Sequence, residues 1–128
     1  MLNIDIKTIP HKKQKYETVG DYWEKNGKKS IRVSDMKNPK YELLIAIHEL
    51  LEQALTADRG IAEKLINEFD HRFEAERELG QHTIDEEPGF DPYAPYLKEH
   101  AFATKVERML AQELGVDWEK YNHIVNHL

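Results

Sequence analysis

The chain contains no cysteine among its 128 residues. This absence excludes a disulfide framework, thiol catalysis and zinc sites built on cysteine, and it fits a protein of the reducing cytoplasm. No apolar run approaches the ~20 residues that cross a bilayer, and the first ten residues lack the basic-then-apolar pattern of a signal peptide. We therefore expect a cytoplasmic protein without a membrane partner.

Positive charge is scarce, because 18 Lys and Arg residues face 24 Asp and Glu residues and give a net charge of −6. Phosphate contacts depend on clustered Lys and Arg, and the one basic run, residues 11–15, is short and falls in a predicted turn. We therefore expect no nucleic-acid partner. The chain also lacks a glycine-rich phosphate loop and a Gly-x-Ser-x-Gly elbow, so P-loop nucleotide binding and serine hydrolysis have no support.

The composition that remains is typical of one folded domain. Hydrophobic residues make up 40% of the chain and charged residues 33%, and 128 residues suffice to bury one core. We predict a single α+β domain over residues 1–128. It comprises a β-sheet region over 1–36 and a helical region over 39–128, interrupted by a long loop at 80–96.

The β-region is predicted from alternation and from one turn. Residues 2–6 alternate apolar and polar side chains, the pattern of a half-buried strand. Asn26-Gly27 is a strong hairpin signal, and it separates residues 21–24 from a strand that places Ile31 and Val33 on one face. We predict a three-stranded antiparallel sheet, with three to four helices packed on it because a lone hairpin is only marginally stable.

The helices are predicted from their ends and their apolar stripes. Asn38 and Pro39 suit the start of a helix that runs to about Ala57 and ends at Gly60. It is apolar nearly all round, so most of its circumference should be buried. Two further helices are expected over about 61–79 and 97–114, with a short last helix after Asp117. The inward face of the 61–79 helix should hold Ile61, Leu65, Phe69 and Phe73.

The most informative polar residues lie inside the first helix. His48 and Glu52 are four residues apart and so share one face, on the same stripe as Leu44, Leu51 and Leu55. A carboxylate in apolar surroundings must be paired, protonated or bound to a cation, because its desolvation is unfavourable by several kcal/mol. A His and a carboxylate four apart can also bind one ion from the same side.

A second inward-facing set is predicted in the 97–114 helix, where His100, Ala103 and Glu107 fall on one stripe. If the two sets face each other, burial can be offset by one shared cation or by a hydrogen-bond network that fixes helix register. The sequence leaves both interpretations open. Asp70 and Glu74 border the apolar face of the 61–79 helix, and either could join the cluster.

The string His-Glu-x-x-Glu at residues 48–52 resembles the active helix of minimal, zincin-like zinc metallopeptidases. These combine a small sheet, a buried helix carrying His-Glu-x-x-His and a third ligand from a later helix. The resemblance implies that His48 is the first ligand of a divalent metal, preferably zinc, and Glu52 the second. It implies that Glu49 is the general base acting on a zinc-bound water. Glu52 stands where that family has histidine.

The same resemblance implies that His100 is the third ligand, with Glu107 and Glu99 as alternatives. The chain is also similar to small uncharacterised proteins of phages and prophages, in segments such as 31–36, 41–61 and 96–107. Two hypotheses follow. The first is a zincin-like metal-binding protein, with hydrolysis by a metal-bound water as its candidate activity. The second is a non-catalytic phage-type accessory protein, whose His/Glu cluster is structural and whose long loop engages an unknown protein or peptide.

Three further patterns give weaker candidates for functional residues. Glu49-x-x-Glu52 followed by Asp70 and Glu74 loosely resembles the acid quartets of all-helical nucleotide pyrophosphohydrolases, but the second motif of that family is missing. His123 and His127 are four apart, and we expect them to be exposed. The aromatic residues of the long loop are expected to serve either as a lid over the cluster or as ordinary packing: Phe90, Tyr93 and Tyr96.

Overall fold

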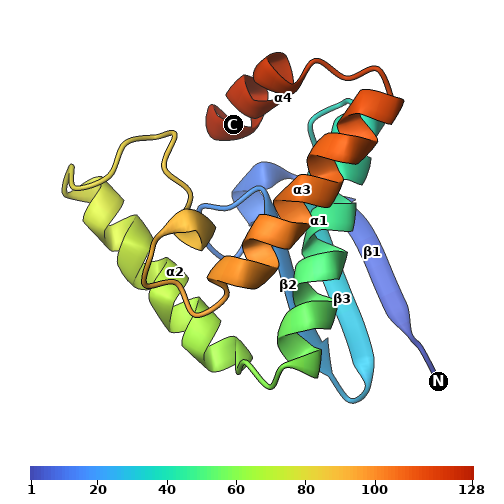
Figure 1. The fold of residues 1–128 in the computed structure, drawn as a ribbon, viewed down its shortest axis with the longest axis vertical. Helices are drawn as coiled ribbons and strands as arrows, with labels where there is room; N and C mark the ends of the chain where they lie inside the picture. Colours follow the sequence, from blue (N-terminus) through green and yellow to red (C-terminus); the bar gives the residue numbers. More distant parts are fainter.

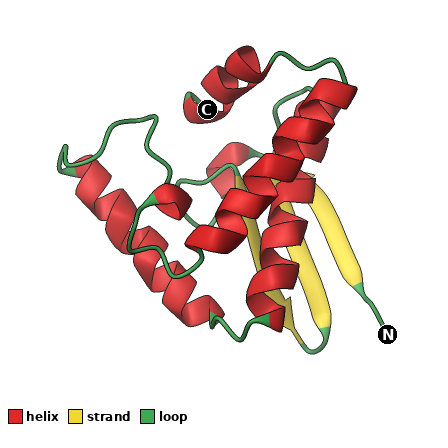
Figure 2. Cartoon of the chain, in the orientation of Figure 1, coloured by secondary structure: helices red, strands yellow, loops and turns green.

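The computed structural model describes all of residues 1–128, and it shows a three-stranded sheet followed by four helices (Figure 1). The predicted α+β class is therefore confirmed, and Figure 2 shows the strands gathered on one side of the molecule with helices on the other. The elements in chain order are β1 (Ile4–Ile9), η1 (His11–Lys13), β2 (Gly20–Lys25), β3 (Lys28–Ser34), α1 (Pro39–Asp58), α2 (Glu63–Glu78), η2 (Pro88–Phe90), α3 (Leu97–Glu113) and α4 (Trp118–Asn126).

The sheet is mixed, and the prediction of an all-antiparallel sheet is wrong. Its strand order is β1-β3-β2, with β2 antiparallel to β3 and β1 parallel to β3. The hairpin is as predicted, since Asn26 and Gly27 both adopt positive φ, at 54° and 77°. The error lies in the first connection. The connection of residues 10–19 is long enough to span two strand spacings, about 10 Å. β2 therefore does not lie next to β1, and β3 lies between them.

Helix α1 begins and ends where the sequence predicts. The Asn38 side chain accepts hydrogen bonds from the backbone N–H groups of Lys40 and Tyr41, and Gly60, at φ 69°, follows its end. Figure 1 shows α1 lying along the sheet with α3 crossing it. The main core consists of side chains from the sheet, α1, α3 and α4: Tyr22, Ile31, Val33, Leu44, Ile45, Ala46, Ala111 and Tyr121.

Two predictions about helix faces need correction. Helix α1 is less buried than predicted, because Leu43 is 44% exposed and Ile47 is only half-buried. On α2, Leu65 is 52% exposed, and Ile66 takes the inward place. The buried stripe of α2 includes Asp70. A prediction that looks only for apolar residues misses a buried face that contains an acid.

The long loop between α2 and α3 contains the short helix η2, which packs against both α2 and α3. This packing brings the middle of the loop over the amino-terminal end of α3, where His100 lies. None of the helices is long and apolar enough to cross a bilayer.

Candidate metal centre

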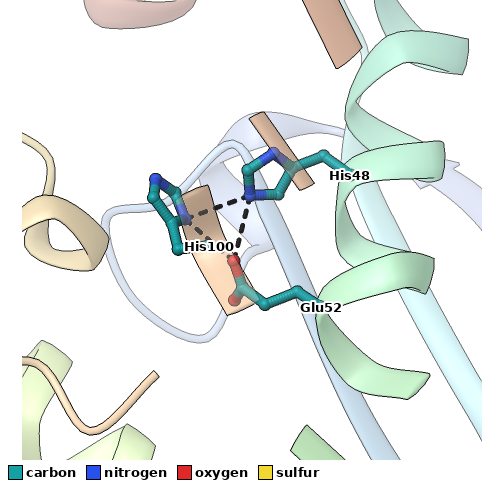
Figure 3. Close-up of side chains that lie close together, drawn as sticks. All are labelled: His48, Glu52 and His100. Atoms are coloured by element: carbon teal, nitrogen blue, oxygen red, sulfur yellow. Dashed lines mark hydrogen bonds and ion pairs between the residues drawn. The ribbon is translucent and has the colours of Figure 1, made fainter. Parts of the chain in front are cut away.

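Three donor atoms from two helices converge in the interior. His48 and Glu52 come from α1 and His100 from α3, and all three residues are at most 7% exposed. His48 Nε2 lies 3.0 Å from Glu52 Oε2 and 3.1 Å from His100 Nδ1. Glu52 Oε2 lies 2.8 Å from His100 Nδ1. Figure 3 shows the two imidazoles and the carboxylate turned toward one another. We call these three atoms the donor triangle.

The donor triangle has the size and composition of a metal site. The three atoms are close enough for one ion to contact all of them. Bonds of about 2.0–2.1 Å in tetrahedral geometry place zinc ligands roughly 3.3 Å apart, a few tenths of an ångström more than the separations here. The predicted convergence of His48, Glu52 and His100 is therefore confirmed, as a buried group that can hold a metal ion.

Two further carboxylates fix which nitrogens face the donor triangle. Glu107 Oε1 lies 2.7 Å from His48 Nδ1, and Glu87 Oε1 lies 3.2 Å from His100 Nε2. With a cation in the triangle both rings would be neutral, and the single proton of each ring would then lie on its outer nitrogen, because an ionised carboxylate only accepts hydrogen bonds. The inner nitrogens, His48 Nε2 and His100 Nδ1, then present lone pairs to the triangle. Outer carboxylates of this kind commonly orient histidine ligands in metal sites.

The ionisation of the cluster shows why it needs positive charge. Burial lowers the pKa of His48, but hydrogen bonds to Glu107 and Glu52 outweigh it, and the pKa is raised well above its ordinary value. Burial also opposes protonation of His100, yet hydrogen bonds to Glu52 and Glu87 raise its pKa to about 9. Burial raises the pKa of Glu52, but the two histidines hold it at about 2. Without a bound ion, protons on the two imidazoles supply the positive charge beside Glu52.

Glu107 lies behind His48 rather than in the donor triangle. Its second carboxylate oxygen accepts a hydrogen bond of 2.5 Å from the hydroxyl of Tyr121, which is 1% exposed on α4. The last helix is thereby connected to the cluster through one tyrosine. The sequence predicts the inward direction of Glu107, but it contains no signal for the role of Tyr121 or of Glu87, because both contacts depend on tertiary structure.

The remaining candidate acids lie outside the triangle. Glu99 forms an ion pair of 2.5 Å with Arg59, and Glu74 forms one of 3.1 Å with Arg77. Asp70 is 6% exposed and accepts hydrogen bonds of 2.6 Å and 3.2 Å from two tyrosine hydroxyls. Burial raises the pKa of Asp70 to about 7, although its tyrosine partners oppose the shift. The acid quartet of a nucleotide pyrophosphohydrolase is not assembled.

Glu49 borders the same cavity as the donor triangle but has no partner. The cavity measures about 470 Å³ and is lined by His48, Glu49, Glu52 and His100 among others. Glu49 is half-buried, and its carboxylate forms no hydrogen bond or ion pair. Burial, followed by the nearby charge of Glu52, raises its pKa well above the ordinary value. A Cβ atom at Gly20 would lie 2.8 Å from its side chain, so this glycine leaves the room that Glu49 occupies.

The aromatic residues of the long loop divide between solvent and interior. Tyr96 is 3% exposed, Phe90 is 45% exposed and Tyr93 is 88% exposed. The Phe90 ring meets the His100 ring edge-on at 4.6 Å between centroids. His123 and His127 are exposed, as predicted, and their rings stack on each other at 4.0 Å.

No family model matches the chain, and no curated protein or solved structure shows significant similarity to it. The resemblances to zincin-like peptidases and to small phage proteins therefore stay predictions.

Proposed function

We propose that this protein binds one zinc ion through His48, Glu52 and His100 and uses it to hydrolyse a substrate. The observation that carries the proposal is the donor triangle, in which three atoms lie 2.8–3.1 Å apart in a buried site. Two imidazoles and one glutamate form a donor set of catalytic zinc enzymes, where the fourth position stays open for water or substrate. Structural zinc sites, in contrast, are usually closed by four protein ligands.

Glu49 supports the hydrolytic part of the proposal. A bound zinc ion supplies a polarised water at neutral pH, and a hydrolase then needs a group that accepts the proton of this water. Glu49 borders the cavity of the donor triangle and has no other partner. Its raised pKa lies in the direction that a general base needs, and a nearby cation would favour its ionised form.

The charge of the cavity narrows the substrate class. Ten carboxylate side chains line it, against a single guanidinium, that of Arg77. This guanidinium is occupied by Glu74 and by two loop carbonyl groups. A field of this sign disfavours phosphate esters and other anionic substrates. We therefore propose a neutral or cationic substrate with a peptide or ester bond.

Metal analysis tests the binding step. The protein is purified without an affinity tag, with both His123 and His127 replaced by alanine, so that an exposed histidine pair contributes no metal. We expect about one zinc ion per chain, and loss of it on dialysis against a chelator together with a lower unfolding temperature. Absence of metal and of any chelator effect would support the structural interpretation of the cluster instead. Iron in place of zinc would contradict hydrolysis, because the same donor set serves non-haem iron(II).

The general base is tested by Glu49→Gln, with Glu74→Gln as the matched control. Both residues line the cavity, but Glu74 is paired with Arg77. On a fluorogenic peptide library, we expect Glu49→Gln to keep its zinc and lose about 10²–10⁴-fold in rate, while the control keeps both. A Glu49→Gln protein with full activity would remove Glu49 from the proposal.

A further inference from the structure

Gly89 lies directly against the imidazole of His100. A Cβ atom at this position would lie 2.5 Å from His100 Nδ1 and 2.6 Å from Cδ2, distances that real Cβ contacts essentially never show. Gly89 does not adopt a positive φ, unlike four of the other glycines. Its backbone is therefore open to any residue, and the requirement for glycine comes from the histidine ring alone.

The neighbours of Gly89 contact the same ring. We call residues 87–90 the strap. The Glu87 carboxylate lies 3.2 Å from His100 Nε2, and the Phe90 ring meets the imidazole edge-on at 4.6 Å. On its other side, the imidazole faces Glu52 and His48 from α1, at 2.8 Å and 3.1 Å from Nδ1. His100 is thus held between the strap and α1.

The segment before the strap is fixed to α2. The Arg77 guanidinium donates to the backbone carbonyls of Thr83 and Glu86. The Glu86 carboxylate lies 2.9 Å from Nδ1 of His82, whose ring stacks on Phe73 of α2 at 3.8 Å. These contacts order the loop immediately before it crosses His100, so the strap is held in a defined position against the imidazole ring.

We propose that Gly89 is a positioning residue for the third metal ligand. Its missing side chain lets the strap lie flat on His100 and hold Nδ1 in the donor triangle. Any side chain at position 89 pushes the ring away from Glu52 and His48, or lifts the strap and removes Glu87 from Nε2. The proposal rests on the zinc site proposed above.

The first test measures zinc affinity in Gly89→Ala. We expect a loss of about 10–100-fold, the size usual for residues that orient a ligand, and a changed visible spectrum of the cobalt-substituted protein. Glu87→Gln is the second variant, because Glu87 is exposed and its loss leaves the backbone unchanged. Glu87→Gln should also weaken zinc binding. Wild-type affinity in Gly89→Ala overturns the proposal.

A double-mutant cycle on the metal-free protein separates positioning from a general backbone effect. Gly89→Ala should lower the unfolding temperature when His100 is present and change it little in a His100→Ala background, where the ring is gone. An equal loss in both backgrounds overturns the proposal. If both proteins that carry Gly89→Ala fail to fold, unchanged zinc affinity in Glu87→Gln overturns the proposal, and weakened affinity supports it. A wild-type protein that binds no zinc refutes the proposed function, whereas the cycle still reports on Gly89.

Discussion

His48 and His82 are each flanked by two glutamates, at nearly the same distances. His48 lies 2.7 Å from Glu107 through Nδ1 and 3.0 Å from Glu52 through Nε2. His82 lies 2.9 Å from Glu86 through Nδ1 and 3.1 Å from Glu76 through Nε2. In both cases one of the glutamates follows the histidine by four residues, so the local pattern in the sequence is the same.

What separates the two clusters is burial and a third donor. The side chains of Glu52 and Glu107 are 6% and 8% exposed, whereas those of Glu76 and Glu86 are 40% and 49% exposed. In both clusters the carboxylates lie on opposite nitrogens of one ring, but around His82 no second imidazole joins either of them. A His and a Glu four residues apart therefore form only a pair. A ligand from another helix turns such a pair into a metal centre.

Removal of the third donor should give the largest difference between the clusters. We expect His100→Ala to lower zinc affinity by at least about 100-fold, more than the loss of an outer partner. His82→Ala should lower it far less, because the His82 ring only helps to order the loop before the strap. Isothermal titration calorimetry, with zinc added to chelator-treated protein, measures both affinities. An equal loss in the two variants would mean that neither cluster is a specific site.

The pH dependence of stability should differ between metal-free and zinc-loaded protein. His100 has a folded-state pKa of about 9, above the ordinary value of about 6.5. The folded protein therefore binds more protons, and this stabilisation is lost as the pH rises through 9. Between pH 7.5 and 9.5, where Asp70 with its pKa of about 7 is already mostly ionised, the metal-free protein should lose about 2 kcal/mol through His100.

In the zinc-loaded protein the ion replaces these protons, so the loss over the same range should vanish. Denaturant unfolding at a series of pH values measures the free energy of unfolding in both forms. The His100→Ala protein is the control, and its metal-free form should show a flatter profile. A stability of the metal-free protein that increases with pH over this range would contradict the assignment of the proton to His100.

The smallest effect is expected from the outer carboxylate of the buried cluster. Glu107→Gln keeps an oxygen that can accept a hydrogen bond but removes the charge that orients His48, so zinc affinity should fall by about tenfold. Glu86→Gln, at the exposed cluster, is the matched control and should lower zinc affinity by less, because Glu86 contacts His82 and Thr83 but no zinc ligand. Competition with a chromogenic chelator resolves a difference of this size. Equal affinities for the two variants would show that Glu107 serves packing alone.

The part of the site that is local in sequence could be predicted. His48 and Glu52 lie on one helix whose start is marked by Asn38 and Pro39, so their common direction follows from helical geometry. The inward direction of His100 follows from its stripe with Ala103. The class of the fold could be predicted in the same way, from alternation in the first 36 residues and apolar stripes in the remainder.

The parts that depend on tertiary structure could not be predicted. The pairing of β1 with β3 depends on the path of residues 10–19, which carry no pattern that specifies it. Glu87 and Tyr121 lie in segments whose local sequence gives no direction for their side chains, and each reaches the cluster only through the packing of a loop or of α4. Gly89 resembles any loop glycine until the ring of His100 is placed against it.

Anomalous diffraction at the zinc absorption edge shows whether one ion binds at the donor triangle. Crystals of the His123→Ala/His127→Ala protein should show a single strong peak about 2.0–2.2 Å from His48 Nε2, a Glu52 carboxylate oxygen and His100 Nδ1. A zinc-soaked crystal with no peak between α1 and α3, or with zinc only at other histidines such as His82, would contradict binding at the donor triangle.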